Sequence, residues 1–506
     1  MEGDLIDVPT VSKRYLAFDL GAESGRAILG SIENGILRLE ELHRFANTPV
    51  HVLSALYWDV LRLFHEILHG LEIAGRERRL TLDGVGVDTW GVDFGLLGSD
   101  GSLCANPRHY RDARNSGMLE GVCGCVSREE IFNQTGIQFM QFNTLIQLYA
   151  MKAGGDPALE SARTLLFMPD LFNYWLTGVA RSEATIASTS QFYDPRGKRW
   201  AVELLRKLEL PASILTEIVA SGTCLGPLLP ALADRVALDR VPVYATCGHD
   251  TASAVAAVPA EGDDWLFISS GTWSLMGAEV EQPVINARSL EMNLTNEIGA
   301  GGKVRLLKNI AGLWLLQECR SAWARESAQF TYEDLVLRAA RAQPFTAVLD
   351  PDAFVSPGNM PRRIKEYCRH TDQRVPTTPA EVARTILESL ALRYRHVLEM
   401  LESLLGRRFN IIHIVGGGSR NQLLNQFVAD ATGRTVIAGP VEATATGNVL
   451  TQAIGSGAIA DLYEARTLVR RSFLTERIEP MEGVDWRRAY EKYLHLVGRP
   501  LRVCGQ

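Results

Sequence analysis

Two widely separated segments of the chain share one layout, in which an apolar run ends in a turn of glycine and small polar residues and a second apolar run follows. The first segment is 15–29 (YLAFDLGAESGRAIL) and the second is 266–276 (LFISSGTWSLM). Glycine allows backbone N–H groups to approach an anion closely, and serine and threonine hydroxyls add donors. Either segment alone also fits an ordinary β-hairpin. Their repetition predicts two halves that each open with a phosphate-binding loop.

The rest of the chain alternates between strand-like and helix-like patterns, which is typical of the α/β class. Residues 84–97 form a strand–turn–strand pattern. Residues 378–405 form a long amphipathic helix with a capping box at its start and a glycine after its end. The run 409–415 is a strand that leads into a glycine triplet and another helix. We therefore expect an N-terminal domain over 14–248 and a C-terminal domain over 249–500.

The composition excludes several classes of protein. Hydrophobic residues make up 46% and charged residues 22% of the chain, which excludes disordered and fibrous proteins. The 52 Lys and Arg against 59 Asp and Glu give a net charge of −7, which argues against nucleic-acid and anionic-membrane partners. Eight cysteines are too few for a disulfide scaffold, and the N-terminus lacks the features of a signal peptide. We predict a cytoplasmic protein with reduced thiols.

One metal-binding signature is present and needs an explanation. Residues 65–69 read His-Glu-Ile-Leu-His, which matches the H-E-x-x-H pattern of zinc metalloproteases. The surrounding segment 59–71 predicts an amphipathic helix that begins after Asp59. No third ligand is evident, and Glu72 stands where the extended motif has a glycine. We therefore interpret the trio as a surface feature of an ordinary helix and predict no zinc there.

Two aspartates are candidates for chemistry. Asp19 ends a buried strand, where its carboxylate could hold Mg²⁺ through water, because hard cations prefer carboxylate oxygens. Asp250, in the stretch 248–255 (GHDTASAV), precedes a helix of small residues. It is either the N-cap of that helix or a general base kept ionised by the helix dipole.

The glycine triplet 416–418 also has two interpretations. Bare backbone there would let a purine or ribose lie flat against the chain, and the following helix N-terminus would favour negative charge. Alternatively, the triplet is a plain strand-to-helix turn with Ser419 as the helix cap. The sequence has neither a G-x-x-x-x-G-K-[ST] loop nor a complete G-x-G-x-x-G motif, so the common nucleotide signatures are absent.

Together these segments make the chain similar to a known family. The stretches that carry the similarity are FDLGAESGR (18–26), DTWGVDF (88–94), TGIQFMQFNTL (135–145), MPDLFNYWLTG (168–178), GHDTASAV (248–255), SSGTWSLMG (269–277), LKNIAGLWLLQ (307–317), HIVGGGSRNQLLNQ (413–426) and IAGPVEATATGN (437–448). They resemble the FGGY carbohydrate kinases of the actin/hexokinase/Hsp70 ATPase superfamily. The resemblance implies an α/β fold of two ribonuclease-H-like domains flanking a central cleft.

The resemblance also implies an activity and a set of site residues. The stretches 269–277 and 307–317 are specific to the branch that acts on L-rhamnulose, so the implied reaction is Mg²⁺- and ATP-dependent phosphorylation of its O1 hydroxyl to L-rhamnulose 1-phosphate. Asp250 is the implied catalytic base. The implied nucleotide contacts are Ala22, Glu23, Ser24, Gly25, Arg26, Thr272, Gln317 and Gly417. The implied sugar contacts are Gly91, His249, Asp250, Thr251 and Asn309.

One position departs from the family pattern. Glu23 stands where the family has a small hydroxyl residue, and a carboxylate beside a triphosphate would be repelled. We therefore expect the Glu23 side chain to point into solvent. The alternatives are a kinase of a related sugar, such as L-fuculose or L-xylulose, and a non-catalytic actin-like ATPase of the chaperone type. We expect a monomer or homodimer whose partners are a small sugar and ATP.

Overall fold

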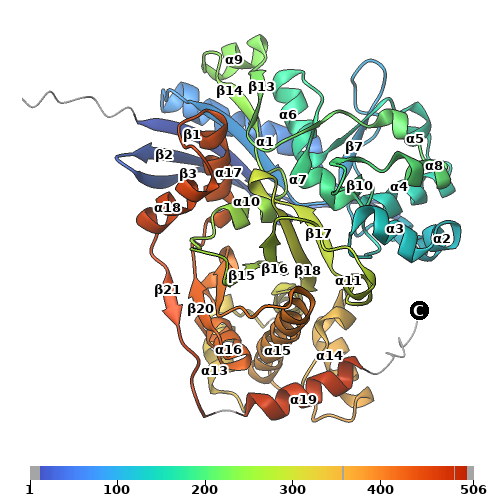
Figure 1. Cartoon of the computed structure of the whole chain (residues 1–506), viewed down its shortest axis with the longest axis vertical. Coiled ribbons are helices and arrows are strands. Elements are labelled where there is room, and N and C mark those ends of the chain that lie inside the picture. Colours follow the sequence, from blue (N-terminus) through green and yellow to red (C-terminus); the bar gives the residue numbers. More distant parts are fainter. Residues whose placement is uncertain (1–11, 327, 356–357, 484, 499–506) are drawn as a thin grey trace, which may run out of the picture. The chain divides into compact units, whose positions relative to one another are not determined.

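The structure is a computed structural model that describes residues 12–326, 328–355, 358–483 and 485–498 (Figure 1). The chain forms two compact units, and each is assembled from separate segments. The first comprises Met1–Pro259, Glu279–Leu306 and Ala443–Phe473, and the second comprises Ala260–Ala278, Leu307–Glu442 and Leu474–Gln506. The units therefore differ from the contiguous domains 14–248 and 249–500 that we expected, and Asp250 belongs to the first unit.

The elements of the first unit alternate between strands and helices. They are β1 (Lys13–Leu20), β2 (Ser24–Glu33), β3 (Ile36–Ala46), β4 (Val50–Val52), β5 (Ala55–Tyr57), α1 (Val60–Glu72), β6 (Gly84–Thr89), β7 (Phe94–Leu97), α2 (Met118–Cys125), α3 (Arg128–Thr135), α4 (Thr144–Ala153), α5 (Pro157–Ser161), β8 (Thr164–Phe167), α6 (Met168–Thr177), β9 (Ser182–Glu183), α7 (Ala184–Ala187), β10 (Tyr193–Asp194), β11 (Arg199–Trp200), α8 (Val202–Lys207), β12 (Ile218–Val219), β13 (Thr223–Pro227), α9 (Pro230–Val236), β14 (Pro242–Ala245), α10 (Asp250–Ala256), α11 (Ala287–Glu291), β17 (Thr295–Ile298), α17 (Ala443–Gly455) and α18 (Leu462–Ser472).

The second unit has fewer strands and longer helices. Its elements are β15 (Trp265–Ser270), α12 (Trp314–Arg325), α13 (Tyr332–Arg341), α14 (Met360–His370), α15 (Pro379–Leu405), β19 (Ile411–Val415), α16 (Gln422–Thr432), β20 (Thr435–Ala438), β21 (Glu476–Ile478) and α19 (Trp486–Val497). The division between the units falls within β16 (Trp273–Val280) and β18 (Val304–Ala311).

The main sheet of the first unit has the strand order β13-β14-β6-β1-β2-β3. Strand β1 pairs antiparallel with β2 and parallel with β6. Its residues from Tyr15 to Leu20 are buried, as expected for a central strand that is covered on both faces. Helix α17 packs against β1 and α10, and Figure 1 shows α17 beside α10. This packing places the start of α10 near the carboxyl ends of β1 and β6, where ligands bind in α/β sheets.

The sheet of the second unit repeats part of this arrangement. Strand β15 pairs antiparallel with β16 and parallel with β19, and β19 pairs parallel with β20. The predicted repetition of strand, polar turn and strand is therefore confirmed in both units. Helix α15 is also confirmed, with the capping box at Thr378 and Gly406 in the left-handed conformation at its end.

The 84–97 segment forms two strands as predicted, but they do not pair with each other. Strand β6 lies between β14 and β1 in the main sheet, whereas β7 pairs with β8. The turn between them holds Val92 at φ +68°, which is a rare conformation for a β-branched residue. The strained turn between them therefore directs the chain from one sheet to another.

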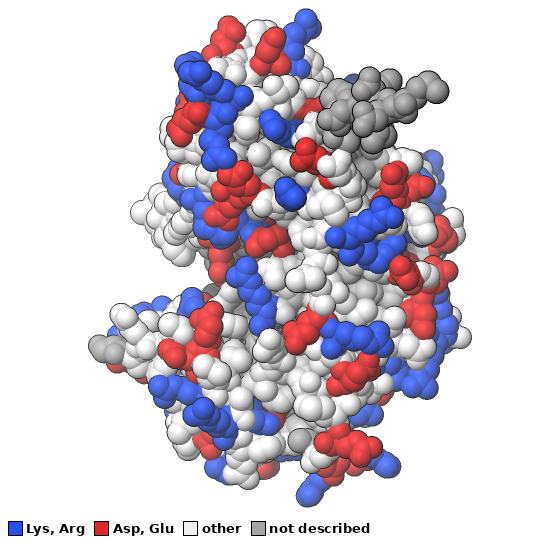
Figure 2. All heavy atoms as spheres, turned by 90° about the vertical axis from the view of Figure 1, so that its left-hand side faces the viewer, with Lys and Arg blue, Asp and Glu red and all other residues white. Residues whose placement is uncertain are grey.

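The surface and the thiols have simple descriptions. On the face drawn in Figure 2, acidic and basic side chains are interspersed rather than gathered by sign. In the described ranges, no helix combines the length and the apolar character needed to cross a bilayer. Every cysteine that the structure describes is a free thiol, and Cys504 lies outside the described residues, as do residues 1–11.

Candidate active site

Two aspartates lie side by side at the ends of neighbouring parallel strands of the first unit. Asp19 of β1 is in register with Asp88 of β6. Asp88 is fully buried, and its Oδ2 accepts a hydrogen bond of 2.6 Å from Asn448 Nδ2. Burial and the nearby Asp19 charge raise the pKa of Asp88 well above its usual range. Within the described residues Asp88 Oδ1 has no hydrogen-bond partner, so this carboxylate is available to a cation or a water.

The predicted phosphate loop is a compact turn between β1 and β2. The Gly21 N–H donates to Ser24 O at 2.9 Å, and Asn47 Nδ2 donates to Gly21 O at 2.8 Å. A Cβ at Gly25 would lie 2.2 Å from the Phe45 ring, so packing requires glycine at this position. Glu23 is exposed, as we expected. Gly25 is therefore needed for packing against Phe45 in the sheet, in addition to its predicted role in binding an anion.

Arg26, an implied nucleotide contact, forms an ion pair with Asp19. The two residues face each other in the β1–β2 register, and Arg26 Nη2 donates to Asp19 Oδ2. Both side chains are largely buried, at 17% and 8% exposure. The pair therefore joins the predicted phosphate loop to the predicted metal-binding carboxylate.

Asp250 lies at the first position of α10, and the N-cap is His249. The interpretation of Asp250 as an N-cap is therefore wrong, because its residue already has helical geometry. Asp250 Oδ1 accepts hydrogen bonds from Thr251 N at 2.5 Å and Thr251 Oγ1 at 3.2 Å. Burial raises the pKa of Asp250. The nearby His249 partly offsets this rise, and the Asp19 charge adds to it. We expected the helix dipole to keep Asp250 ionised, but its net pKa is raised rather than lowered. A raised pKa suits a general base.

His249 is held between charged groups that the sequence reasoning did not identify. Its Nε2 lies 3.4 Å from Asp250 Oδ1, and its Nδ1 lies 3.2 Å from Arg305 Nη2 and 3.3 Å from Glu297 Oε2. A Cβ at Gly91 would lie 3.2 Å from His249 Nε2. Gly91, His249, Asp250 and Thr251 thus form one neighbourhood, and their role as sugar contacts stays a prediction. Glu297 and Arg305 lie in no recognised motif, and the fold brings them to His249.

A buried carboxylate fixes the backbone of this turn. Glu183 Oε2 accepts hydrogen bonds from Gly248 N at 3.0 Å and Thr185 N at 2.9 Å. Thr185 Oγ1 in turn accepts from His249 N at 3.2 Å. Burial raises the pKa of Glu183, although these donors oppose the shift. The backbone before Asp250 is therefore anchored to the α7 region.

The Gly91–Val92 turn is fixed in a similar way. Thr144 Oγ1 donates to Val92 O at 2.7 Å, and Val92 N donates to Thr189 Oγ1 at 3.2 Å. Next to it, the buried carboxylate of Asp93 accepts hydrogen bonds from Trp58 Nε1, Trp90 Nε1, Gln147 Nε2 and Tyr110 N. Burial raises the pKa of Asp93 to about 6 despite these donors. Strain at Val92 is thus sustained by its surroundings, as at many functional sites.

In the second unit, the turn after β15 is bonded to the start of α12. Leu313 N donates to Gly271 O and Trp314 N donates to Thr272 O, both at 3.1 Å. Helix α12 carries Gln317, whose buried Oε1 has no hydrogen-bond partner among the described residues. Backbone hydrogen bonds between the turn and the start of α12 therefore link the segments that carry two implied nucleotide contacts, Thr272 and Gln317. Asn309, an implied sugar contact, lies on β18 in this unit, whereas the other four implied sugar contacts belong to the first unit.

The glycine triplet packs against the end of β15. A Cβ at Gly418 would lie 2.1 Å from Ser270 Oγ, and one at Gly416 would lie 3.1 Å from Ser270 O. Only Gly417 faces open space, which fits its implied nucleotide contact. The interpretation of Ser419 as a helix cap is wrong, because a 3₁₀ turn (Gly417–Arg420) intervenes and Asn421 caps α16. The triplet is thus required mainly for close packing.

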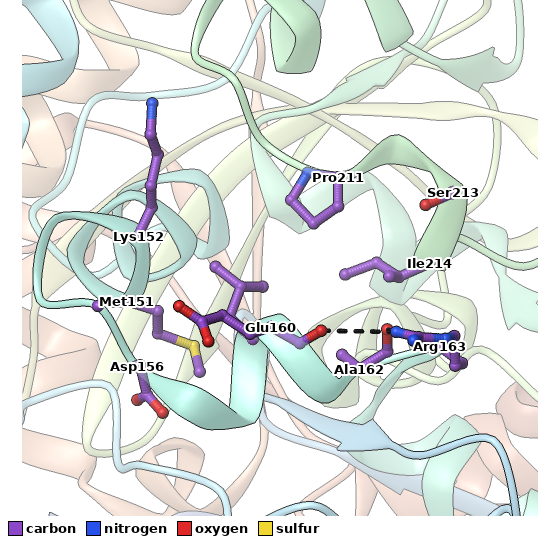
Figure 3. Close-up of a pocket in the computed structure, with 11 residues that line it drawn as sticks. Met151, Lys152, Asp156, Glu160, Ala162, Arg163, Pro211, Ser213 and Ile214 are labelled. Atoms are coloured by element: carbon purple, nitrogen blue, oxygen red, sulfur yellow. Dashed lines mark hydrogen bonds between the residues drawn. The ribbon is translucent and has the colours of Figure 1, made fainter.

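Two other features lie apart from this neighbourhood. Glu66 of the His-Glu-His trio accepts from His43 Nε2 at 2.7 Å and Arg62 Nη1 at 3.2 Å, and His65 is exposed. The absence of zinc there stays a prediction. A pocket of about 460 Å³ lies between α4, α5 and residues 211–214 (Figure 3). None of the predicted site residues lines it, and its Arg163 Nη1 is hydrogen-bonded to Ala162 O at 2.8 Å.

Comparison with solved structures identifies the fold. The fold matches a gluconate kinase from Lactobacillus acidophilus with a TM-score of 0.77 and 16% identity, covering 96% of this chain and 97% of that one. It matches a Plasmodium falciparum glycerol kinase with ADP at a TM-score of 0.77 and 14% identity, covering 98% and 99%. The fold is therefore that of the sugar kinases with an actin-like ATPase architecture.

Sequence comparison makes the assignment more specific. The N-terminal domain model of the FGGY family of carbohydrate kinases matches residues 14–257, and the C-terminal domain model matches 266–456. A rhamnulokinase from Bacteroides thetaiotaomicron is 44% identical over 96% of this chain and 100% of its own length. One from Enterococcus faecalis is 42% identical over 92% and 94%. The chain belongs to the FGGY family of carbohydrate kinases.

Proposed function

We propose that this enzyme transfers the γ-phosphoryl group of ATP to O1 of L-rhamnulose, giving L-rhamnulose 1-phosphate. The observation that carries the proposal is the arrangement of Asp250, His249 and Gly91 beside the Asp19–Asp88 pair, in a chain 44% identical to a rhamnulokinase along nearly its whole length. We propose further that it acts in the cytoplasm in L-rhamnose catabolism, as a monomer or homodimer.

Asp250 has the properties required of the base. Its side chain is 31% exposed, so a sugar hydroxyl can reach it, and its raised pKa favours acceptance of a proton. In phosphoryl transfer the chemical step needs mainly positioning and charge stabilisation. Asp250 accepts the O1 proton, while His249, Thr251 and the Gly91 backbone orient the ketose, and Asn309 supplies a further contact.

The residues around Asp88 fit a divalent cation. A buried carboxylate oxygen without a partner, next to a second carboxylate, is the oxygen-rich environment that Mg²⁺ prefers. Asp19 and Asp88 would hold the ion through water. When bound, Mg²⁺ offsets negative charge on the phosphate oxygens. Residues 22–26 would contact the phosphates, and Thr272, Gln317 and Gly417 would contact the rest of the nucleotide.

A sugar panel tests the proposal. ADP release should be measured with ATP and Mg²⁺ in the presence of L-rhamnulose, L-fuculose, L-xylulose or glycerol, and without sugar. We expect the highest kcat/KM with L-rhamnulose and little ADP release without sugar. A higher kcat/KM with another sugar would assign the related-sugar alternative, and sugar-independent ADP release would favour the chaperone-type ATPase.

A further inference from the structure

The imidazole of His249 has different partners on its two nitrogens. Nε2 faces the carboxylate of Asp250 at 3.4 Å. Nδ1 is hydrogen-bonded to Arg305 Nη2 at 3.2 Å and also lies 3.3 Å from Glu297 Oε2, a contact without hydrogen-bond geometry. An ionised carboxylate can only accept a hydrogen bond, so Nε2 must carry the hydrogen when Asp250 is the base. A neutral imidazole then has a bare Nδ1, which requires a donor. A guanidinium is always a donor, and Arg305 Nη2 supplies it.

Arg305 is itself firmly oriented. Its side chain is fully buried, and its Nη2 lies 3.1 Å from Glu297 Oε2 and 3.2 Å from Ile298 O. Arg305 Nε also donates to Ile298 O at 3.2 Å. The carboxylate of Glu297 is buried as well, and Arg305 is the cation that it faces. A buried arginine and glutamate therefore form a rigid frame behind the imidazole.

We infer that Arg305, oriented by Glu297, is a positioning residue that holds His249 with Nδ1 as acceptor and Nε2–H directed at Asp250. The inference rests on the proposed role of Asp250 as base. Neither residue touches the reacting atoms. Their effect passes through the imidazole, which limits the orientations of the Asp250 carboxylate. The absence of a side chain at Gly91 leaves the space that this imidazole orientation needs.

The first measurement needs no substrate, and it uses a variant only to assign the His249 signals. Histidine labelled with ¹⁵N in the whole enzyme gives separate NMR signals for protonated and bare ring nitrogens, and the His249 signals are those lost in His249→Gln. We expect a protonated Nε2 and a bare Nδ1. The opposite tautomer in the wild-type enzyme would overturn the inference, whatever the enzyme phosphorylates.

The second measurement removes the frame without leaving a buried charge unpaired. Glu297→Met with Arg305→Met replaces both partners, since replacing a whole buried ion pair is tolerated far better than breaking it. We expect a mixed tautomer and a kcat lowered about 10- to 100-fold, as for outer partners of other functional imidazoles, with KM for ATP unchanged. An unchanged kcat together with an unchanged tautomer would overturn the inference.

A matched pair controls for general destabilisation. Arg466 Nη2 lies 2.9 Å from Glu279 Oε2, and both side chains are largely buried in the first unit. Arg466 also donates to Val255 O at 3.1 Å near the other end of α10. Glu279→Met with Arg466→Met should leave kcat and the His249 tautomer unchanged, and an equal fall in kcat in the control would overturn the inference. If the wild-type enzyme phosphorylates no sugar, the proposed function fails while the tautomer result stands.

Discussion

The turn after β1 and the turn after β15 share a sequence pattern but are built from different chemistry. In the first unit, the turn adjoins Asp19, Asp88 and Asp250, and burial raises the pKa values of Asp88 and Asp250. In the second unit, the corresponding turn adjoins Thr272 and Gln317, whose side chains do not ionise. Under the proposed function, the first turn would serve proton and metal chemistry, whereas the second would serve binding.

The largest effect that would break this comparison is expected at Asp250. Asp250→Asn removes the ability to accept a proton, so turnover should fall about 10²- to 10⁴-fold. The melting temperature should stay the same or rise, because His249 rather than Asp250 is the N-cap and the folded state disfavours the ionised carboxylate. Nucleotide affinity, measured by calorimetry, should be retained. A fully active variant would remove the chemical distinction between the two turns.

Asp93 offers a smaller, pH-dependent test in the first unit. Its pKa of about 6 lies above the value of about 3.9 for an unfolded chain, so the folded state binds the proton more tightly. The contribution of protonated Asp93 to the free energy of unfolding is therefore complete below about pH 4. It falls by roughly 3 kcal/mol as the pH rises to about 6. Asp93→Asn should abolish that loss, because a neutral amide does not titrate.

The measurement is the difference in unfolding free energy between Asp93→Asn and the wild-type protein at pH 4 and pH 7. We expect the variant to gain relative stability at the higher pH. Asp100→Asn is the control, because Asp100 is fully exposed and hydrogen bonds from Ser102 lower its pKa rather than raise it. Equal differences at both pH values for Asp93→Asn would show that Asp93 does not titrate in this range.

Much of the fold could be predicted from local patterns. The strands on both sides of each turn, the Asp59 cap of α1 and the capping box of α15 all depend on residues close in sequence. The separate partners of β6 and β7 could not be predicted, because they depend on a strained turn at Val92 and on distant strands. The discontinuous units likewise depend on contacts made by segments far apart in the chain.

The site was likewise predicted only where its residues lie in local sequence motifs. Asp19, His249, Asp250 and Thr251 lie in recognisable motifs, and the structure gathers them in one unit. Arg305, Glu297 and Glu183 have no motif, because their roles come from burial and from partners on other elements. A charged residue inside an apolar strand, such as Arg305 in β18, was the signal that could have indicated a buried ion pair.

The smallest effect is expected in the second unit, where the adjacent glycines Gly417 and Gly418 differ in how closely they are packed. Gly418→Ala places a Cβ 2.1 Å from Ser270 Oγ and 2.9 Å from Ser270 O, so the end of β15 must shift. Overpacking of this kind costs about 1–3 kcal/mol, and thermal unfolding should show it. Gly417→Ala meets nothing within 4 Å, so its stability should be unchanged or slightly higher.

The two variants should also separate packing from nucleotide binding. If a nucleotide lies against the backbone at Gly417, the added methyl group should raise KM for ATP without lowering the melting temperature. Gly418→Ala should lower the melting temperature by displacing Ser270. Because both changes add one methyl group one residue apart, their difference reports only the surroundings. Identical behaviour of the two variants would mean that the second turn has no distinct binding surface, and the division between chemistry in one unit and binding in the other would lose its support.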